Sequence, residues 1–310
     1  MASQSRYPSA AIENVHRRLD ELGNAFNPEV IAENFKLFGP LHEREPFSDM
    51  AVTRDLRYGS DERHRLDVFR PKPADGGARP VLAFVHGGGF IGGDKTMAGA
   101  PFYDNVGTWA VRHGLIGVNV TYRLAPKHPW PAGSEDLGAA LSWIRSKIAS
   151  QGGDPARVYL MGQSAGGAHV AHYLAHERFA GPDRQALAGA ILVSGLYDPM
   201  TMDKNPMFTA YFGGDASCYP EQSALPGLAI SSTPLLVLIA EHDPPDFKRQ
   251  YVELLRACVG VRGTLPHLAY LPSHGHLSTI LSVNTVDEFV GERILDFVQA
   301  TAARPTAVSA

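Results

Sequence analysis

The sequence predicts an α/β protein with one mostly parallel, twisted sheet, an antiparallel N-terminal hairpin and helices on both faces of the sheet. Three observations support this prediction. Residues 52–58 and 65–69 alternate between apolar and polar types across a Gly-Ser-Asp turn, which indicates the hairpin. The near-continuous apolar run 81–85 is typical of a strand buried on both faces. Later strands alternate with segments of helical spacing, which favours a parallel sheet.

Most remaining elements follow from the two-residue period of strands and the 3.6-residue period of helices. Further strands are predicted at 115–120, 157–161, 188–193, 235–239 and 265–271, with helices ending at Val111 and spanning 134–150, 169–176, 246–259 and 286–298. Residues 9–40 also show helical spacing, in two amphipathic segments, the second opened by Asn27-Pro28. Residues 198–233 show little periodicity, and we expect them to cross the carboxyl end of the sheet.

The domain organisation predicted is a single domain over 1–310, to which 1–45 and about 198–233 contribute a small helical cap. A chain of 310 residues that is 44% hydrophobic is long enough to bury a large core. The N-terminal helical pair either covers an edge of the sheet or forms part of a lid. The small, polar tail from Ala302 onward is expected to fray.

A serine lies between a predicted strand and a predicted helix. Residues 162–166 read Gly-Gln-Ser-Ala-Gly. A G-x-S-x-G sequence at a strand-to-helix turn is typical of a nucleophile elbow, which exposes the serine hydroxyl at the edge of the sheet. The flanking glycines are required because a Cβ at either position would collide with the strand or the helix. In this context the pattern predicts Ser164 as a nucleophile, rather than a solvated serine in a glycine-rich turn.

A glycine-rich loop, His-Gly-Gly-Gly-Phe at 86–90, follows the predicted strand 81–85. Attack by serine on a carbonyl produces an oxyanion, and each preorganised N–H donor at that oxygen contributes about 3 kcal/mol. The expected donors are the backbone N–H groups of Gly88, Gly89 and Ala165. The loop also matches the dinucleotide pattern G-x-G-x-x-G, but the next predicted strand ends without the acidic residue that a ribose needs.

A serine becomes nucleophilic when a histidine takes its proton and an acid orients that histidine. In hydrolases with a nucleophile elbow the chain order is serine, acid, histidine. Asp243 follows the predicted strand 235–239 and is therefore predicted as the acid. Asp246 is expected to cap the next helix, and Glu241 is a weaker alternative.

Two histidines follow the last predicted strand, at positions 274 and 276. We predict His276 as the base because it immediately precedes an apolar helical run. His274 would then line the pocket or lie in the loop. The substrate pocket is expected to include Phe90, Met207 and Tyr211, although ordinary core or lid packing is the favoured explanation for any one of them.

The composition excludes several classes of function. A net charge of −4 gives no reason to expect nucleic acid or an anionic membrane as a partner. Two cysteines are too few for a disulfide framework, and the sequence shows neither a secretory signal nor an apolar run of 18 residues. We therefore expect a cytoplasmic protein. The remaining histidines form no spaced ligand set, so no metal and no cofactor is predicted. The oligomeric state is left open.

From about Asp55 to Phe297, the sequence resembles the hormone-sensitive-lipase-type esterases of the α/β-hydrolase superfamily. The residues that carry the resemblance are His-Gly-Gly-Gly-Phe at 86–90, Tyr-Arg-Leu-Ala-Pro at 122–126, Pro-Ala at 131–132, Glu-Asp at 135–136, Gly-Gln-Ser-Ala-Gly-Gly at 162–167 and Asp-Pro at 243–244. The resemblance implies hydrolysis of small to medium carboxylic esters through an acyl-enzyme. It also implies that Arg123 and Asp136 support the oxyanion loop and that N-terminal helices cap the site.

The segment 273–278, Ser-His-Gly-His-Leu-Ser, departs from the His-Gly-Phe that is usual at the base of that family. It is similar to the neighbouring branch of small carboxylesterases and arylformamidase-like hydrolases, in which the histidine precedes a bulky residue and a helix. This similarity supports His276. It leaves an arylformamidase, amidase or carbamate hydrolase with the same triad as the alternative to an esterase. A hydrolase-fold protein that only binds a ligand is a further alternative.

Overall fold

The computed structural model describes residues 10–73, 76–180 and 187–302. Its centre is an eight-stranded sheet in the order β1-β2-β4-β3-β5-β6-β7-β8. The strands are β1 (Met50–Arg57), β2 (Arg65–Pro71), β3 (Arg79–Val85), β4 (Ile116–Val120), β5 (Gly153–Gln163), β6 (Leu187–Val193), β7 (Leu235–His242) and β8 (His267–Gly275). β2 is antiparallel to both β1 and β4, and all other neighbours are parallel. The predicted fold class, including the N-terminal hairpin, is confirmed.

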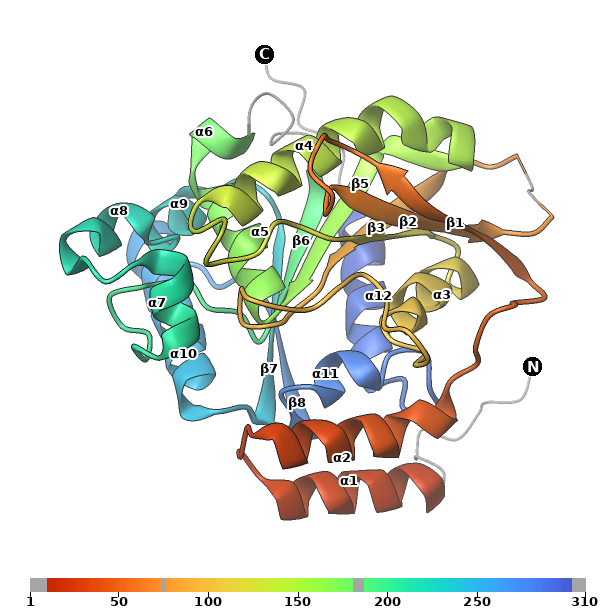
Figure 1. Ribbon diagram of the computed structural model, residues 1–310, viewed down its shortest axis with the longest axis horizontal. Coiled ribbons are helices and arrows are strands. Elements are labelled where there is room, and N and C mark those ends of the chain that lie inside the picture. The colour runs from red at the N-terminus through yellow and green to blue at the C-terminus, as the bar shows by residue number, and fades with distance from the viewer. Residues whose placement is uncertain (1–9, 74–75, 181–186, 303–310) are drawn as a thin grey trace.

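Helices lie on both faces of the sheet (Figure 1). They are α1 (Ala10–Leu22), α2 (Pro28–Phe38), α3 (Asp104–Arg112), α4 (Ala132–Lys147), α5 (Ala165–Ala175), α6 (Glu177–Ala180), α7 (Pro206–Phe212), α8 (Tyr219–Gln222), α9 (Leu225–Ile230), α10 (Pro245–Arg262), α11 (Ser278–Leu281) and α12 (Phe289–Ala302). In the described ranges, no helix combines the length and apolarity that crossing a membrane requires.

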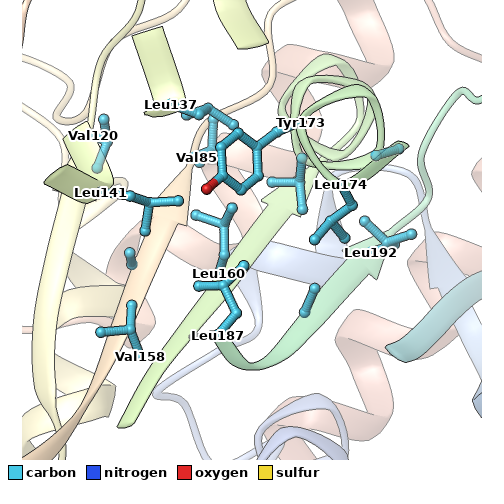
Figure 2. Close-up of a cluster of buried hydrophobic side chains, with 14 of the residues drawn as sticks. Val85, Val120, Leu137, Leu141, Val158, Leu160, Tyr173, Leu174, Leu187 and Leu192 are labelled. Carbon is cyan, nitrogen blue, oxygen red and sulfur yellow. The ribbon is translucent and has the colours of Figure 1, made fainter. Parts of the chain in front are cut away.

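The strands bury alternate side chains in two cores because successive residues of a strand point to opposite faces. Val81 and Val85 of β3 pack with α4 and α5, whereas Leu82 and Phe84 pack with α3 and α12 on the other face. Figure 2 shows part of the first core, in which Leu160 of β5 lies beneath residues of α4 and α5. This double burial explains why the central strands read as continuous apolar runs.

The two N-terminal helices lie side by side beneath the ends of β7 and β8 (Figure 1). Asn27 caps α2 by accepting a 2.9 Å hydrogen bond from the backbone N–H of Val30, as the Asn-Pro pair predicts. Leu19 of α1 and Phe38 of α2 are buried in the second core. The side chain of Asp20 lies 2.8 Å from Nε2 of His242, at the end of β7. The pair therefore packs against the carboxyl edge of the sheet, where the predicted base and acid lie.

Residues 198–233 contain more regular structure than their sequence indicates. They form three short α-helices, α7, α8 and α9, of seven, four and six residues. Each is too short to show a 3.6-residue period, which is why the prediction missed them. Each has a proline in its first turn, where the missing N–H costs no hydrogen bond. The predicted fraying from Ala302 concerns residues that lie almost wholly outside the described ones.

We expect Leu160→Ala to lower the free energy of unfolding by about 2–5 kcal/mol, because it opens a cavity in the first core. Leu160 is 1% exposed. Leu268→Ala is the matched control, since Leu268 is 38% exposed on β8, and its cost should be about 1 kcal/mol or less. Urea denaturation followed by circular dichroism measures both. Equal losses in the two variants would contradict the assignment of Leu160 to the core.

Candidate active site

Ser164 occupies a strained turn between β5 and α5. Its φ of 56° lies in the left-handed region, which a side chain rarely adopts and which the surrounding structure has to enforce. Its N–H donates to the carbonyl of Val193, 3.0 Å away, and its own carbonyl accepts from Ala168 at 3.0 Å. A Cβ at Gly162 or Gly166 would come within 3 Å of backbone atoms. The local geometry is therefore that of the predicted elbow.

Asp243 and His276 meet at the carboxyl edge of the sheet. Nδ1 of His276 lies 2.6 Å from Oδ1 of Asp243, whose side chain is fully buried. The other carboxylate oxygen accepts hydrogen bonds from the hydroxyl of Ser194 at 2.6 Å and the N–H of Ala240 at 2.7 Å. Three donors thus hold this carboxylate in place, which is the arrangement that stabilises a buried carboxylate.

The second ring nitrogen of His276, Nε2, is buried and has no hydrogen-bond partner among the described residues. Ser164 and His276 line the same cavity. The imidazole is positioned by the ring of Phe247, with centroids 4.1 Å apart, and by Phe26, at 5.0 Å. The side-chain amide of Gln163 donates to the carbonyl of His276 at 3.0 Å, which ties the residue before Ser164 to the loop after β8.

The glycine-rich loop after β3 lies against Ser164. A Cβ added to Gly87 would stand 3.1 Å from Cβ of Ser164. Gly88 and Gly89 have φ values of 131° and 60°, so both adopt conformations that favour glycine. Ala165 is the first residue of α5, and its N–H therefore has no acceptor within the helix. The glycine-rich loop and the first turn of α5, which carry the predicted donors, thus both adjoin Ser164.

The segment after β4 holds this loop in place. The N–H of Ala125 donates to the carbonyl of Phe90 at 3.0 Å, and the hydroxyl of Tyr122 donates to the carbonyl of His86 at 2.9 Å. Arg123 is fixed in turn, because its backbone N–H and its Nε donate to the carboxylate of Asp136 at 2.7 and 2.8 Å. Arg123 and Asp136 therefore support the glycine-rich loop through the backbone of residues 122–125.

His86 is a packing residue in this structure. It is fully buried, and its ring stacks on Tyr122 with centroids 4.5 Å apart. Burial lowers the pKa of His86 to about 3. A histidine that stays neutral at physiological pH can fill the space under the loop without an unpaired buried charge.

The cavity above Ser164 has a volume of about 660 Å³. Apolar side chains from two distant parts of the chain line it: Phe26, Ile31 and Phe35 from α2 and the loop before it, and Met202, Met207 and Phe208 from the 198–233 segment. Phe90 also lines it. Tyr211 instead lies behind Phe90, with the two rings stacked 4.4 Å apart and its hydroxyl 3.1 Å from Nδ1 of His169.

The alternative acid and base candidates lie in other environments. Asp246 is in the first turn of α10, where its Oδ2 accepts from the N–H of Asp203 at 3.0 Å, and burial raises its pKa. Glu241 accepts from the N–H of Ser273 at 2.9 Å. Nδ1 of His274 lies 3.0 Å from the carbonyl of Pro272, and burial lowers the pKa of this imidazole. These contacts of Asp246, Glu241 and His274 involve neither Ser164 nor His276.

Sequence reasoning missed four residues that position the predicted groups: Phe26, Gln163, Ser194 and Phe247. Gln163 occupies the first variable position of the elbow motif, so the motif indicated its position but not its hydrogen bond to His276. Ser194 directly follows β6, next to the strand that carries Asp243. Phe26 and Phe247 gave no signal, because a single aromatic residue before or within a helix is most often packing.

An α/β-hydrolase is defined by such a sheet with a serine elbow at the end of a central strand. A family model described as alpha/beta hydrolase fold matches residues 82–270. Carboxylesterase NlhH of Mycobacterium tuberculosis is 33% identical over 245 residues, which cover 68% of this chain and 71% of that protein. Esterase B of Lactobacillus rhamnosis matches the fold with a TM-score of 0.71 at 18% identity, over 95% of this chain and 96% of that one.

Another relative matches over a shorter stretch of the chain. Tuliposide A-converting enzyme 2 of Tulipa gesneriana is 40% identical over 111 residues, which cover 33% of this chain and 28% of that protein. The chain belongs to the hormone-sensitive-lipase-type carboxylesterases of the α/β-hydrolase superfamily. It is a carboxylic ester hydrolase.

We expect Gly166→Ala to reduce the hydrolysis of p-nitrophenyl acetate severely and to lower the melting temperature. The new Cβ would meet the carbonyls of Val85 and His86, which are backbone atoms at the start of the glycine-rich loop and cannot rotate away. Gly260→Ala is the control, because Gly260 lies in α10 with open space around its Cβ position. That variant should gain about 0.5–1 kcal/mol of stability at unchanged activity. Full activity in Gly166→Ala would contradict the steric account.

Proposed function

We propose that Ser164, His276 and Asp243 form a catalytic triad that cleaves small to medium carboxylic esters through an acyl-enzyme. The observation that carries the proposal is the 2.6 Å contact between His276 and Asp243, which leaves Nε2 of the imidazole unpartnered in the cavity that Ser164 also lines. A base with one nitrogen held by a buried carboxylate and the other free is what proton transfer from a serine requires.

In the first half of the reaction, Nε2 of His276 removes the hydroxyl proton of Ser164 as Oγ attacks the ester carbonyl. Asp243 accepts a hydrogen bond from Nδ1–H, which selects the tautomer with a free Nε2 and stabilises the imidazolium that forms. The imidazolium then gives its proton to the departing alkoxide. The products of this half are the free alcohol and an ester of Ser164.

The tetrahedral intermediate carries its negative charge on the former carbonyl oxygen. We assign its stabilisation to the backbone N–H groups of Gly88, Gly89 and Ala165, which belong to the glycine-rich loop and to the first turn of α5, both next to Ser164. In the second half of the reaction, His276 activates a water molecule that attacks the acyl-enzyme. Collapse of the second intermediate releases the carboxylic acid and restores the hydroxyl of Ser164.

The cavity supports an apolar acyl or alcohol group of modest size. Its volume of about 660 Å³ falls in the range typical of small-molecule sites, and Phe90 and Met207 are among its apolar lining residues. We propose that residues 10–45, the described part of the predicted cap segment 1–45, act as the cap together with 198–233, because side chains from both segments line the cavity. Tyr211 then acts indirectly, by supporting the ring of Phe90. The carboxylesterase relatives favour an ester over a formamide or carbamate substrate.

Ser164→Ala should lower kcat for p-nitrophenyl butyrate on the order of 10⁴-fold or more, because it removes the attacking oxygen. Ser146→Ala is the matched control, since Ser146 is exposed on α4 and bonds only the carbonyl of Trp143. The control should keep the activity of the unmodified enzyme. Turnover that survives in Ser164→Ala, with folding verified by circular dichroism, would sink the mechanism.

The two histidines at the end of β8 should respond differently to substitution by glutamine. His276→Gln should abolish turnover of the same ester, because glutamine cannot accept the proton of Ser164. His274→Gln should lower it modestly at most, because Nδ1 of His274 contacts a backbone carbonyl rather than Asp243. Steady-state kinetics on both variants measure the difference. The reverse result would move the base to His274.

A further inference from the structure

A second histidine–carboxylate cluster lies beside the candidate active site. His16 of α1, His274 of β8 and Asp287, which precedes α12, place one potential ligand atom each within 4.8 Å of one another. Nε2 of His16 lies 2.8 Å from Oδ2 of Asp287, and Nε2 of His274 lies 3.4 Å from the same oxygen. The three elements come from opposite ends of the chain, so the sequence showed no ligand spacing and predicted no metal site.

Two of the three candidate ligands, His274 and Asp287, are held in place by contacts on their far sides. Nδ1 of His274 lies 3.0 Å from the carbonyl of Pro272, which can only accept, so this nitrogen carries the proton. The lone pair of His274 is therefore on Nε2. Oδ1 of Asp287 accepts from the N–H of Phe289, which leaves Oδ2 to face the two imidazoles. Such outer contacts, which fix tautomer and orientation, are typical of histidines and carboxylates that bind metals.

The contact between His274 and Asp287 lacks a proton or a cation, whereas His16 and Asp287 lie at hydrogen-bond distance. The lone pair of His274 faces a carboxylate oxygen, and both groups are acceptors in these states. Nε2 of His274 is buried without a hydrogen-bond partner in the described part of the chain. The side chains of His274 and Asp287 are only 1% and 4% exposed, so bulk water does not satisfy them. A buried lone pair next to a buried carboxylate is the arrangement that a bound cation resolves.

We propose that His16, His274 and Asp287 bind a divalent transition-metal ion of the Zn²⁺ class. Two imidazole nitrogens and one carboxylate oxygen suit zinc, with water as the fourth ligand of a tetrahedral site. The side chain of His16 is 22% exposed, which gives the ion and its water a route from solvent. The donor set does not suit Ca²⁺ or Mg²⁺, which prefer oxygen ligands only.

The metal would act as a clamp between the N-terminal helices and the loop of His276. His16 lies on α1, which packs against β8, and His274 lies two residues before His276. Phe26, which touches the imidazole of His276, follows α1 in the chain. An ion that joins α1 to β8 therefore stabilises the part of the cap that contacts the proposed base. The proposed metal site and the proposed triad share no residue, so an experiment can disprove one proposal without disproving the other.

The test uses the full chain after removal of metals with EDTA. Isothermal titration with ZnCl₂ should show one equivalent bound, and thermal unfolding should shift to higher temperature with zinc, because an ion that binds only the folded state stabilises it. Co²⁺ in place of zinc should give the visible absorption bands of a four-coordinate site. His16→Gln keeps a donor toward Asp287 but removes the imidazole, and it should weaken zinc binding by about 100-fold or more.

Two variants serve as controls. His242→Gln removes a histidine that also contacts α1, at 2.8 Å from Asp20, and should bind zinc like the unmodified chain. Cys218→Ser removes an exposed thiol that could bind zinc adventitiously, and should also change nothing. Asp287→Asn provides a second loss-of-ligand variant should His16→Gln be poorly folded. Absence of zinc binding, or a zinc affinity in His16→Gln and Asp287→Asn equal to that of the unmodified chain, would overturn the proposal.

Discussion

The close approach of backbone to backbone at the end of β5 is the constraint on which the rest of the site depends. Gly162 and Gly166 leave no room for a Cβ, and Ser164 between them adopts a positive φ. Such a turn persists only where its surroundings over-determine it. Here the N–H of Ser164 is fixed by β6, and the start of the glycine-rich loop after β3 lies directly against Gly166. The serine and the loop therefore cannot move independently.

A second layer of contacts transmits this rigidity to the histidine and the acid. Gln163 connects the elbow to the carbonyl of His276, and Ser194 connects the end of β6 to Asp243. The ends of four neighbouring strands, β5 to β8, thus hold the three predicted catalytic groups through short polar contacts. Preorganisation of this kind matters because a site that has to reorganise during reaction loses much of its electrostatic stabilisation.

The N-terminal segment contacts residues around the candidate active site in addition to covering an edge of the sheet. Phe26 touches the imidazole of His276, while Asp20 and His16 contact side chains at the ends of β7 and before α12. These contacts couple the first helices of the chain to its last loops. The proposed metal site and the proposed cap lie on this one junction, so its stability bears on the shape of the cavity.

Much of the fold and of the candidate site was predictable because it is encoded locally. The apolar runs of the central strands follow from burial on both faces, and the elbow and glycine-rich loop are short motifs whose glycines have local steric causes. The chain order of serine, acid and histidine then restricted the candidates for the acid and the base to the segments that follow two strands. The structure brings Ser164, Asp243 and His276 to one edge of the sheet.

Contacts between distant segments required the folded chain. The stacking of Tyr211 behind Phe90, the hydrogen bond of Gln163 to His276 and the contact of His16 with Asp287 join residues 113 to 271 positions apart. Periodicity reports which face of an element is buried, but not against which partner. Short helices such as α7 are stabilised by capping and packing rather than by a periodic pattern of their own, so their positions too depend on tertiary contacts.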